Sequence, residues 1–351
     1  MKRSTLILGL LCAVVLAFRS WEPGPELPAH FPRPVYDFGR NALRSETVQL
    51  GRALFYDPLL SANNAISCAS CHSQYNGFAH ADHALSHGIH DSIGTRNAPA
   101  LMNLAWQKHF MWDGAVNHLD VQALAPITHP KEMGETLPGV IKKLNASPLY
   151  PALFYAAFGD SAVTGQRILL ALSQFQLTLI SANAKYDSVK AGKATFTPQQ
   201  ARGYALFKTH CNSCHREPLF TTGAFSSNGL PVDTTLNDFG RGALTHRSSD
   251  SLQFKIPTLR NIEFTYPYMH DGRFTRLSEV LAHYTSGIVP HHNLPSSLQK
   301  PIALTPNQKV DLTAFLLTLT DKKFLYNPAF SYPKEIFSSA RRMPVISSSQ
   351  Q

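Results

Sequence analysis

Cysteine is scarce in this sequence, and its placement excludes a class of folds. The chain of 351 residues has 5 cysteines. Cys12 lies in an apolar run near the N-terminus, and the other four belong to two Cys-x-x-Cys-His motifs, at 68–72 and 211–215. No cysteine is left over for a disulfide, so a fold held together by disulfide bonds is excluded.

The two motifs are typical of covalent haem c attachment. Two thioether bonds need cysteines about one helical turn apart, followed by a histidine turned toward the iron. Zinc binding and a redox-active Cys-x-x-Cys pair are the alternatives, and two complete copies disfavour both. The motifs predict two haem c groups with His72 and His215 as proximal ligands, attached through Cys68, Cys71, Cys211 and Cys214.

Long apolar runs are also rare. The run from Leu6 to Phe18 follows Lys2 and Arg3, and it is shorter than the roughly 20 residues that span a bilayer. This pattern is typical of an export signal. We expect residues 1–20 to be a signal peptide, with an uncleaved anchor as the alternative. Haem c is attached outside the cytoplasm, which predicts a periplasmic protein.

The sequence lacks the alternating pattern of β-strands. A broad apolar face predicts a helix over residues 166–181, a Thr-Pro start predicts one from 197, and a third is predicted over 306–319. We expect a mostly α fold with two cytochrome c-like haem domains, long loops and little β structure.

A faint internal repeat supports two haem modules. Gly51-Arg-Ala-Leu-Phe55 precedes the first motif and Gly203-Tyr-Ala-Leu-Phe207 precedes the second, so a helix should lead into each attachment site. The predicted divisions are a linker over 21–44, a first haem domain over 45–190, a second haem domain over 191–330, and a tail over 331–351. We expect the chain after Pro333 to be partly disordered.

At this point the sequence resembles the bacterial di-haem cytochrome c peroxidases and their MauG-type relatives, which oxidise a partner protein. The resemblance covers roughly residues 45–325. It rests on the two haem motifs in order and on five segments: Leu50–Asp57, Arg96–Pro99, Met111–Gly114, Pro130–Gly134, and Pro257–Asn261 followed by Pro267–Gly272.

The resemblance implies catalytic roles for three residues. Glu132 matches the family's acid–base residue at the open face of the first haem, where peroxide cleavage needs a group that takes and returns a proton. Gln122 matches a distal glutamine, and Trp112 matches a tryptophan that relays electrons between the haems. The alternatives are a surface Glu, a solvent-facing Gln and a core Trp.

The resemblance also implies a calcium site between the haems. Asn97, Thr265 and Pro267 match its ligands, one side-chain oxygen and two carbonyls, and such oxygen donors suit Ca2+. The alternative is a loop held by hydrogen bonds alone. Arg96, Arg260 and His270 are candidate partners of the haem propionates.

The sixth ligand of the His215 haem distinguishes two kinds of relative. The resemblance places it at Tyr284, where classical peroxidases have Met and the MauG type has Tyr. A thioether raises the iron potential, whereas a phenolate lowers it. His283 and Met269 are the rival ligands. On a helix, His283 would point about 100° away from Tyr284, so both cannot face the iron.

Histidines are abundant in the loop expected over the first haem. Classical relatives hold one there that ligates the resting iron, but Ile89 occupies the matching position. We therefore assign none of His80, His83, His87 and His90 as a ligand of the first haem. We expect the iron of that haem to have a free coordination position.

The sequence therefore predicts a periplasmic di-haem peroxidase that reduces hydrogen peroxide with electrons from a protein donor, either a small c-type cytochrome or another protein. A MauG-like oxidase that modifies residues of a partner protein is one alternative, and a non-catalytic electron-transfer cytochrome is another. The net charge of +9 fits an acidic partner or a solvated face. We expect no nucleic-acid partner, and a homodimer is compatible with the sequence.

Overall fold

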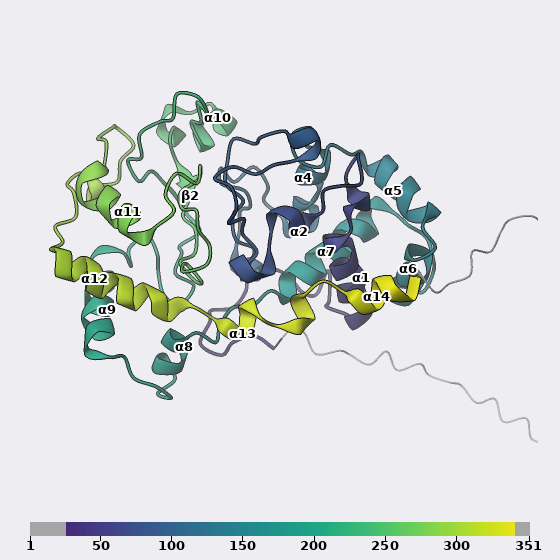
Figure 1. The fold of residues 1–351 in the computed structure, drawn as a ribbon, viewed down its shortest axis with the longest axis horizontal. Coiled ribbons are helices and arrows are strands. Elements are labelled where there is room, and N and C mark those ends of the chain that lie inside the picture. Colours follow the sequence, from purple (N-terminus) through teal and green to yellow (C-terminus); the bar gives the residue numbers. More distant parts are fainter. Residues whose placement is uncertain (1–25, 341–351) are drawn as a thin grey trace, which may run out of the picture.

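The computed structural model describes residues 26–340, so the expected signal peptide or anchor lies outside the described residues. The fold is mostly helical, as predicted (Figure 1). The first half contains α1 Ser45–Tyr56, α2 Cys68–Cys71, α3 Leu119–Gln122, α4 Leu124–Thr128, α5 Leu137–Ala146, α6 Tyr150–Phe158 and α7 Gly165–Thr178.

The second half contains α8 Lys185–Lys190, α9 Pro198–His210, β1 Phe225–Ser226, α10 Arg241–Thr245, β2 Phe254–Lys255, α11 Leu277–Ala282, α12 Pro306–Leu316, α13 Lys322–Leu325 and α14 Lys334–Ala340. The strands β1 and β2 pair antiparallel. The three helices predicted from sequence correspond to α7, α9 and α12, the last extended by a 3-10 turn over Leu317–Leu319. Within the described residues, no helix is long and apolar enough to cross a membrane.

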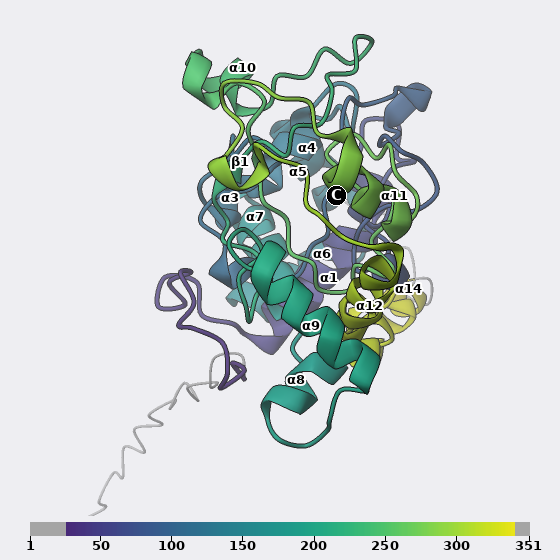
Figure 2. The ribbon, with the colours of Figure 1, turned by 90° about the vertical axis from the view of Figure 1, so that its left-hand side faces the viewer.

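Two hydrophobic cores divide the chain. The first is formed mainly by α1, α5, α6 and α7, and the second lies where α9 packs against α12 (Figure 2). Ala182 belongs to the first core and Tyr186 to the second. The change between cores therefore occurs close to the predicted division of the chain.

The internal repeat has a packing explanation. A Cβ on Gly51 of α1 would lie 1.9 Å from the backbone oxygen of Ala171 in α7. A Cβ on Gly203 of α9 would lie 1.9 Å from the backbone oxygen of Asp311 in α12. Both glycines let two helices cross at close range, because any larger residue would collide with backbone. Each half is thus built on the same helix crossing.

The C-terminal end differs from the sequence prediction. Phe324, Leu325 and Phe330 belong to the first core, although the predicted second domain extended to residue 330. The chain returns to the first half at buried Asp321, because the carboxylate of Asp321 accepts hydrogen bonds from the backbone N–H groups of Ala182 and the next residue. The chain beyond α12 therefore runs back along the first half (Figure 1).

The expected tail is also structured over most of its described length. The chain after Pro333 forms α14 rather than disorder up to Ala340, and Ile336 and Phe337 pack against the first core. Arg52 of α1 fixes this segment, because its guanidinium donates to the backbone oxygen of Ser331 at 2.7 Å. The remainder of the tail lies outside the described residues.

The predicted linker lies against both halves. The backbone N–H groups of Val35 and Tyr36 both donate to the oxygen of Ala105 in the first half. Nε2 of His30 lies 2.9 Å from the carboxylate of Asp187 in α8. This segment therefore drapes over the junction between the two halves.

Candidate functional site

The first attachment motif is a single helical turn. Ser67 begins α2 with a capping box, which sets Cys68 and Cys71 one turn apart. The ring of His72 then bonds through Nδ1 to the backbone oxygen of Phe78 at 2.8 Å. That bond leaves Nε2 as the free ligand atom, and burial lowers the pKa of His72 to about 4, which keeps the ring neutral.

The second motif repeats this arrangement. Helix α9, begun by Thr197 and Pro198, leads directly into Cys211. Nδ1 of His215 lies 3.1 Å from the backbone oxygen of Pro257 and 3.3 Å from that of Phe220. Burial lowers the pKa of His215, so this ring also offers a neutral Nε2. Both motifs therefore fit a covalent haem with a histidine ligand.

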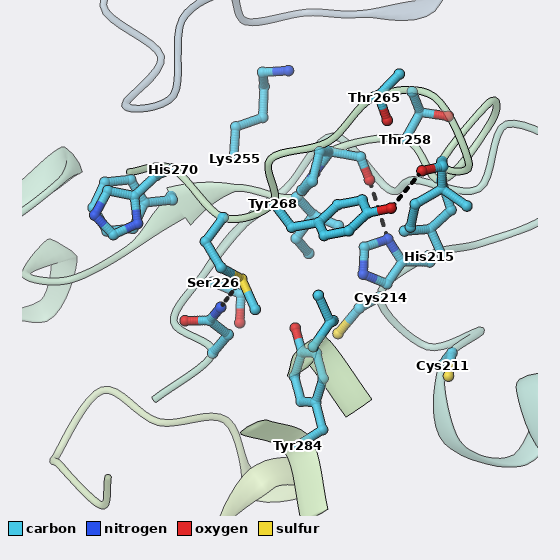
Figure 3. Close-up of a pocket in the computed structure, with 18 of the residues that line it drawn as sticks. Cys211, Cys214, His215, Ser226, Lys255, Thr258, Thr265, Tyr268, His270 and Tyr284 are labelled. Atoms are coloured by element: carbon cyan, nitrogen blue, oxygen red, sulfur yellow. Dashed lines mark hydrogen bonds between the residues drawn. The ribbon is translucent and has the colours of Figure 1, made fainter. Parts of the chain in front are cut away.

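A large cavity adjoins the second motif. Its lining includes Cys211, Cys214, His215 and Tyr284 from the second half and Asn97 and Trp112 from the first. Figure 3 shows the hydroxyl of Tyr284 directed into the space beside Cys214 and His215. Burial raises the pKa of Tyr284 to about 12, so a neighbouring cation such as ferric iron is needed to form the phenolate at neutral pH.

Tyr284 reaches the cavity because α11 ends in a π-helical turn over His283–Gly287. The neighbouring ring of His283 turns elsewhere, and its Nε2 lies 3.0 Å from the backbone oxygen of Asn228. Met269 lines the same cavity as Tyr284. Of the two rival ligands, only Met269 therefore shares the cavity.

Glu132 lies beside the first motif. Burial raises the pKa of the Cys71 thiol to about 11, and the nearby Glu132 carboxylate adds to that shift. The pKa of Glu132 is itself raised by burial, while His129, with Nδ1 3.7 Å from Oε1, opposes the shift. The Glu132 side chain is 45% exposed, so solvent also reaches it. This carboxyl group can exchange protons near the first haem.

The loop that carries Glu132 folds back on α4. The N–H of Met133 donates to the oxygen of Pro126 at 3.1 Å, and the oxygen of Glu132 accepts from Ile89 at 2.8 Å. Gln122 ends α3, is separated from α4 by Ala123 alone, and is half-buried. Within residues 26–340, no hydrogen bond joins the side chains of Gln122 and Glu132.

Trp112 connects the two halves. Its backbone oxygen accepts from the N–H of Lys255 in β2 at 2.6 Å, and its indole Nε1 donates to the oxygen of Asn97 at 2.9 Å. Gly114 permits this approach, since a Cβ there would lie 2.3 Å from the ring of Phe225 and its φ is +77°. Trp112 therefore lies in the lining of the cavity beside the second haem motif, where the two halves meet.

The three predicted calcium ligands share that lining. Asn97, Thr265 and Pro267 all border the cavity. Asn97 is 5% exposed and its amide nitrogen donates to the oxygen of Ala84. Over residues 26–340, no donor bonds to its amide oxygen, which leaves that atom available to a cation.

Two predicted propionate partners are already occupied. The guanidinium of Arg260 is completely buried and pairs with Asp187 at 2.8 Å, so its assignment to a propionate is wrong. Arg96 pairs with Asp238 at 2.6 Å and with Asp113 at 2.7 Å. Both arginines serve long-range ion pairs, which neutralise their charge within the protein.

His270 lines the cavity, with its ring stacked 3.8 Å from that of Phe254. Lys255, which sequence reasoning missed, is the one Lys or Arg in the described lining (Figure 3). Its Nζ donates to Oε1 of Gln107 at 2.8 Å, and burial lowers its pKa to about 8. A haem carboxylate beside it would compensate that buried charge. The sequence could have indicated Lys255, because it lies two residues before the segment Pro257–Asn261.

The histidine-rich loop forms a ring cluster. The rings of His83 and His87 stack at 4.3 Å, and His80 lies 5.4 Å from His83. His90 lies outside this cluster in a 3-10 turn. The described part of the chain has no group of three or more His, Cys, Asp or Glu placed to hold a metal ion.

Comparisons with known proteins agree with this architecture. Residues 45–195 match the family model for di-haem cytochrome c peroxidase, and residues 200–320 match cytochrome c. The methylamine utilization protein MauG of Methylorubrum extorquens is 38% identical over 307 residues, covering 84% of each chain. Cytochrome c551 peroxidase of Nitrosomonas europaea is 35% identical over 68% of this chain and 72% of its own.

A solved structure is also similar. A MauG-like protein associated with microbial copper homeostasis superposes with a TM-score of 0.78 and 32% identity, covering 88% of this chain and 98% of that one. Two cytochrome c-like halves, two haem motifs and these relatives lead to one conclusion. The chain belongs to the di-haem cytochrome c peroxidase family, the oxidoreductases that include MauG, and it carries two haem c groups.

Proposed function

We propose that this protein reduces hydrogen peroxide at the His72 haem with electrons from a protein donor. The observation that carries the proposal is the position of Glu132, a carboxyl group of raised pKa beside the Cys68–Cys71 turn. An electron carrier without turnover has no use for an acid–base group there. The overall reaction consumes one peroxide, two electrons and two protons and yields two waters.

Glu132 would perform the proton transfer of that reaction. Its carboxylate takes a proton from one peroxide oxygen and returns it to the other, which leaves as water. Gln122 would add a hydrogen bond to the bound oxygen. The haem at His72 supplies the redox-active iron for this chemistry.

Trp112 would pass electrons between the haems. Its indole, held to Asn97 at 2.9 Å, lies in the cavity lining shared by both halves, where an oxidisable ring can act as a relay. His215 and Tyr284, which line the same cavity, would hold the iron of the second haem. The protein would thereby hold oxidising equivalents at both haems.

A second candidate is MauG-like oxidation of residues on a partner protein. The position of Tyr284 favours it, because a phenolate ligand stabilises higher oxidation states of iron. The 38% identity to MauG of Methylorubrum extorquens also favours it. With a small c-type cytochrome as donor, the same protein would instead act as a cytochrome-c peroxidase.

A structural calcium ion is part of the proposal. The amide oxygen of Asn97 and the backbone oxygens of Thr265 and Pro267 supply a neutral, hard donor set that suits Ca2+. We also propose a periplasmic location, because haem c is attached outside the cytoplasm.

Addition of peroxide to the fully oxidised holoprotein, followed by absorbance and EPR, tests the function. We expect rapid spectral changes at both haems without prior reduction, and turnover when a protein donor is added. Two low-spin haems whose spectra do not change when peroxide is added would instead indicate a non-catalytic electron carrier. A requirement for half-reduction would favour the classical peroxidase scheme over the MauG type.

A further inference from the structure

Asn228 contacts both Met269 and His283, the two residues that rival Tyr284 as ligand of the second iron. Its amide nitrogen donates to Sδ of Met269 at 3.2 Å. Asn228, Met269 and Tyr284 all line the cavity that contains His215. Met269 thus has its sulfur engaged by a protein donor within the same space into which Tyr284 directs its hydroxyl.

The same residue restrains the other rival. The backbone oxygen of Asn228 lies 3.0 Å from Nε2 of His283, and His283 is 4% exposed. With Nε2 at this carbonyl, His283 has only Nδ1 left for an iron, and His283 does not line the cavity that contains His215. Asn228 therefore contacts each of the two residues that could replace Tyr284.

Asn228 is itself held in one orientation. Its amide oxygen accepts from the N–H of Leu230 at 3.2 Å, which leaves the amide nitrogen to face the cavity. The next residue, Gly229, accepts from the N–H of Val289 at 2.8 Å and so ties this loop to the segment after Tyr284. The loop is thereby coupled to the π-helical turn that presents the tyrosine.

Met269 would otherwise be a good ligand. A thioether ligates haem iron in many c-type cytochromes. Its backbone has φ of +75°, a conformation that non-glycine residues rarely adopt and that surrounding contacts must maintain. The hydrogen bond from Asn228 to the sulfur is one of those contacts.

We propose that Asn228 selects the axial ligand of the second haem: it holds the Met269 thioether away from the iron and leaves the position to Tyr284. The inference rests on the proposed ligation by Tyr284. Asn228 is a positioning residue, because it acts through Met269.

The test uses the ferric holoprotein with both haems. Asn228→Leu removes the donor, and Asn228→Asp keeps the size and shape of the side chain while it also removes the donor. Since one buried hydrogen bond contributes up to about tenfold in an equilibrium, we expect the thioether-ligated fraction to rise by about tenfold in both variants. The far-red thioether-to-iron band and EPR measure that fraction. The midpoint potential of this haem should rise with it.

Two further variants interpret the result. Asn228→Leu combined with Met269→Leu removes the competitor and should return the tyrosinate spectrum. Asn293→Leu, which loses amide donors to Ser248 and Ser251 away from the cavity lining, should leave the spectrum unchanged. Haem content and circular dichroism show whether each variant has folded.

The outcomes separate the two proposals. A wild-type spectrum without tyrosinate ligation contradicts the proposed ligand itself. Wild-type tyrosinate ligation that persists unchanged in the folded Asn228→Asp protein overturns the role of Asn228 and leaves the ligand intact. A spectrum that changes equally in the Met269-free double variant also overturns it, because the effect would not pass through Met269.

Discussion

The indole Nε1 of Trp112 donates a hydrogen bond of 2.9 Å to the backbone oxygen of Asn97. Asn97 is also a proposed calcium ligand through its side chain. The electron relay and the ion site are therefore joined through one residue. A shift of the Asn97 backbone is expected to reach the indole of Trp112, the proposed relay.

Replacement of Trp112 by Phe tests the relay. Phenylalanine keeps most of the packing but lacks an oxidisable indole and its hydrogen bond, whose loss costs about 1 kcal/mol. We expect slower electron exchange between the haems, measured by stopped-flow absorbance after peroxide addition. Trp106→Phe is the matched control, since Trp106 also donates to a backbone oxygen, that of Pro32, at 2.7 Å. Equal rates in wild type and Trp112→Phe would refute the relay.

Removal of calcium should loosen the junction of the two halves. An ion present at 100 times its Kd stabilises the folded state by about 2.7 kcal/mol. A chelator should therefore lower the thermal midpoint by several degrees in wild type and leave Asn97→Ala unaffected. Asn76→Ala, which loses a bond to the oxygen of Phe264, should keep the response to chelator. A thermal midpoint of the wild type that changes neither with chelator nor with added Ca2+ would contradict the proposed calcium site.

Glu132→Gln should abolish most peroxide turnover. Loss of an acid–base group typically lowers rates by about 10²–10⁴-fold. Burial raises the pKa of Glu132, and the group must be ionised to take a proton, so wild-type turnover should fall as the pH drops through that pKa. A pH–rate profile for peroxide consumption measures this limb, and the Gln variant should lack it.

Glu135→Gln is the control for that experiment. Glu135 lies in the same loop and pairs with Lys143 at 2.5 Å, so its replacement removes a carboxylate without touching the first haem motif. This variant should keep the rate and the acidic limb. If both variants lose activity equally, the effect comes from the loop and not from proton transfer by Glu132.

Alanine at Gly51 or Gly203 should destabilise the helix crossing of its own half. The new Cβ would approach a backbone oxygen to 1.9 Å, so the helices must separate, at a cost of about 1–3 kcal/mol or more. Denaturant unfolding measures the loss. Ala201→Gly, at an exposed position of α9, changes helix propensity alone and should cost about 1 kcal/mol. Unchanged stability in both alanine variants would disprove the close crossing.

The sequence by itself determined the features that depend on neighbouring residues. The spacing of Cys68, Cys71 and His72 specifies haem attachment, because the chemistry needs two cysteines one helical turn apart and a histidine directly after the second. The cap at Thr197 predicted α9, since a capping box involves residues three positions apart. The mostly α fold with two haem modules followed from such local signals.

Tertiary structure decided which charges and ligands meet. Arg260 and Asp187 are far apart in sequence, and only the packed fold shows that they neutralise each other. Asp321 draws the C-terminal segment back to the first core by the same kind of long-range bond. Asn228 and Met269 likewise meet only in the cavity. A buried polar group pairs with whichever distant group the fold buries beside it. A local sequence pattern therefore does not predict the partner.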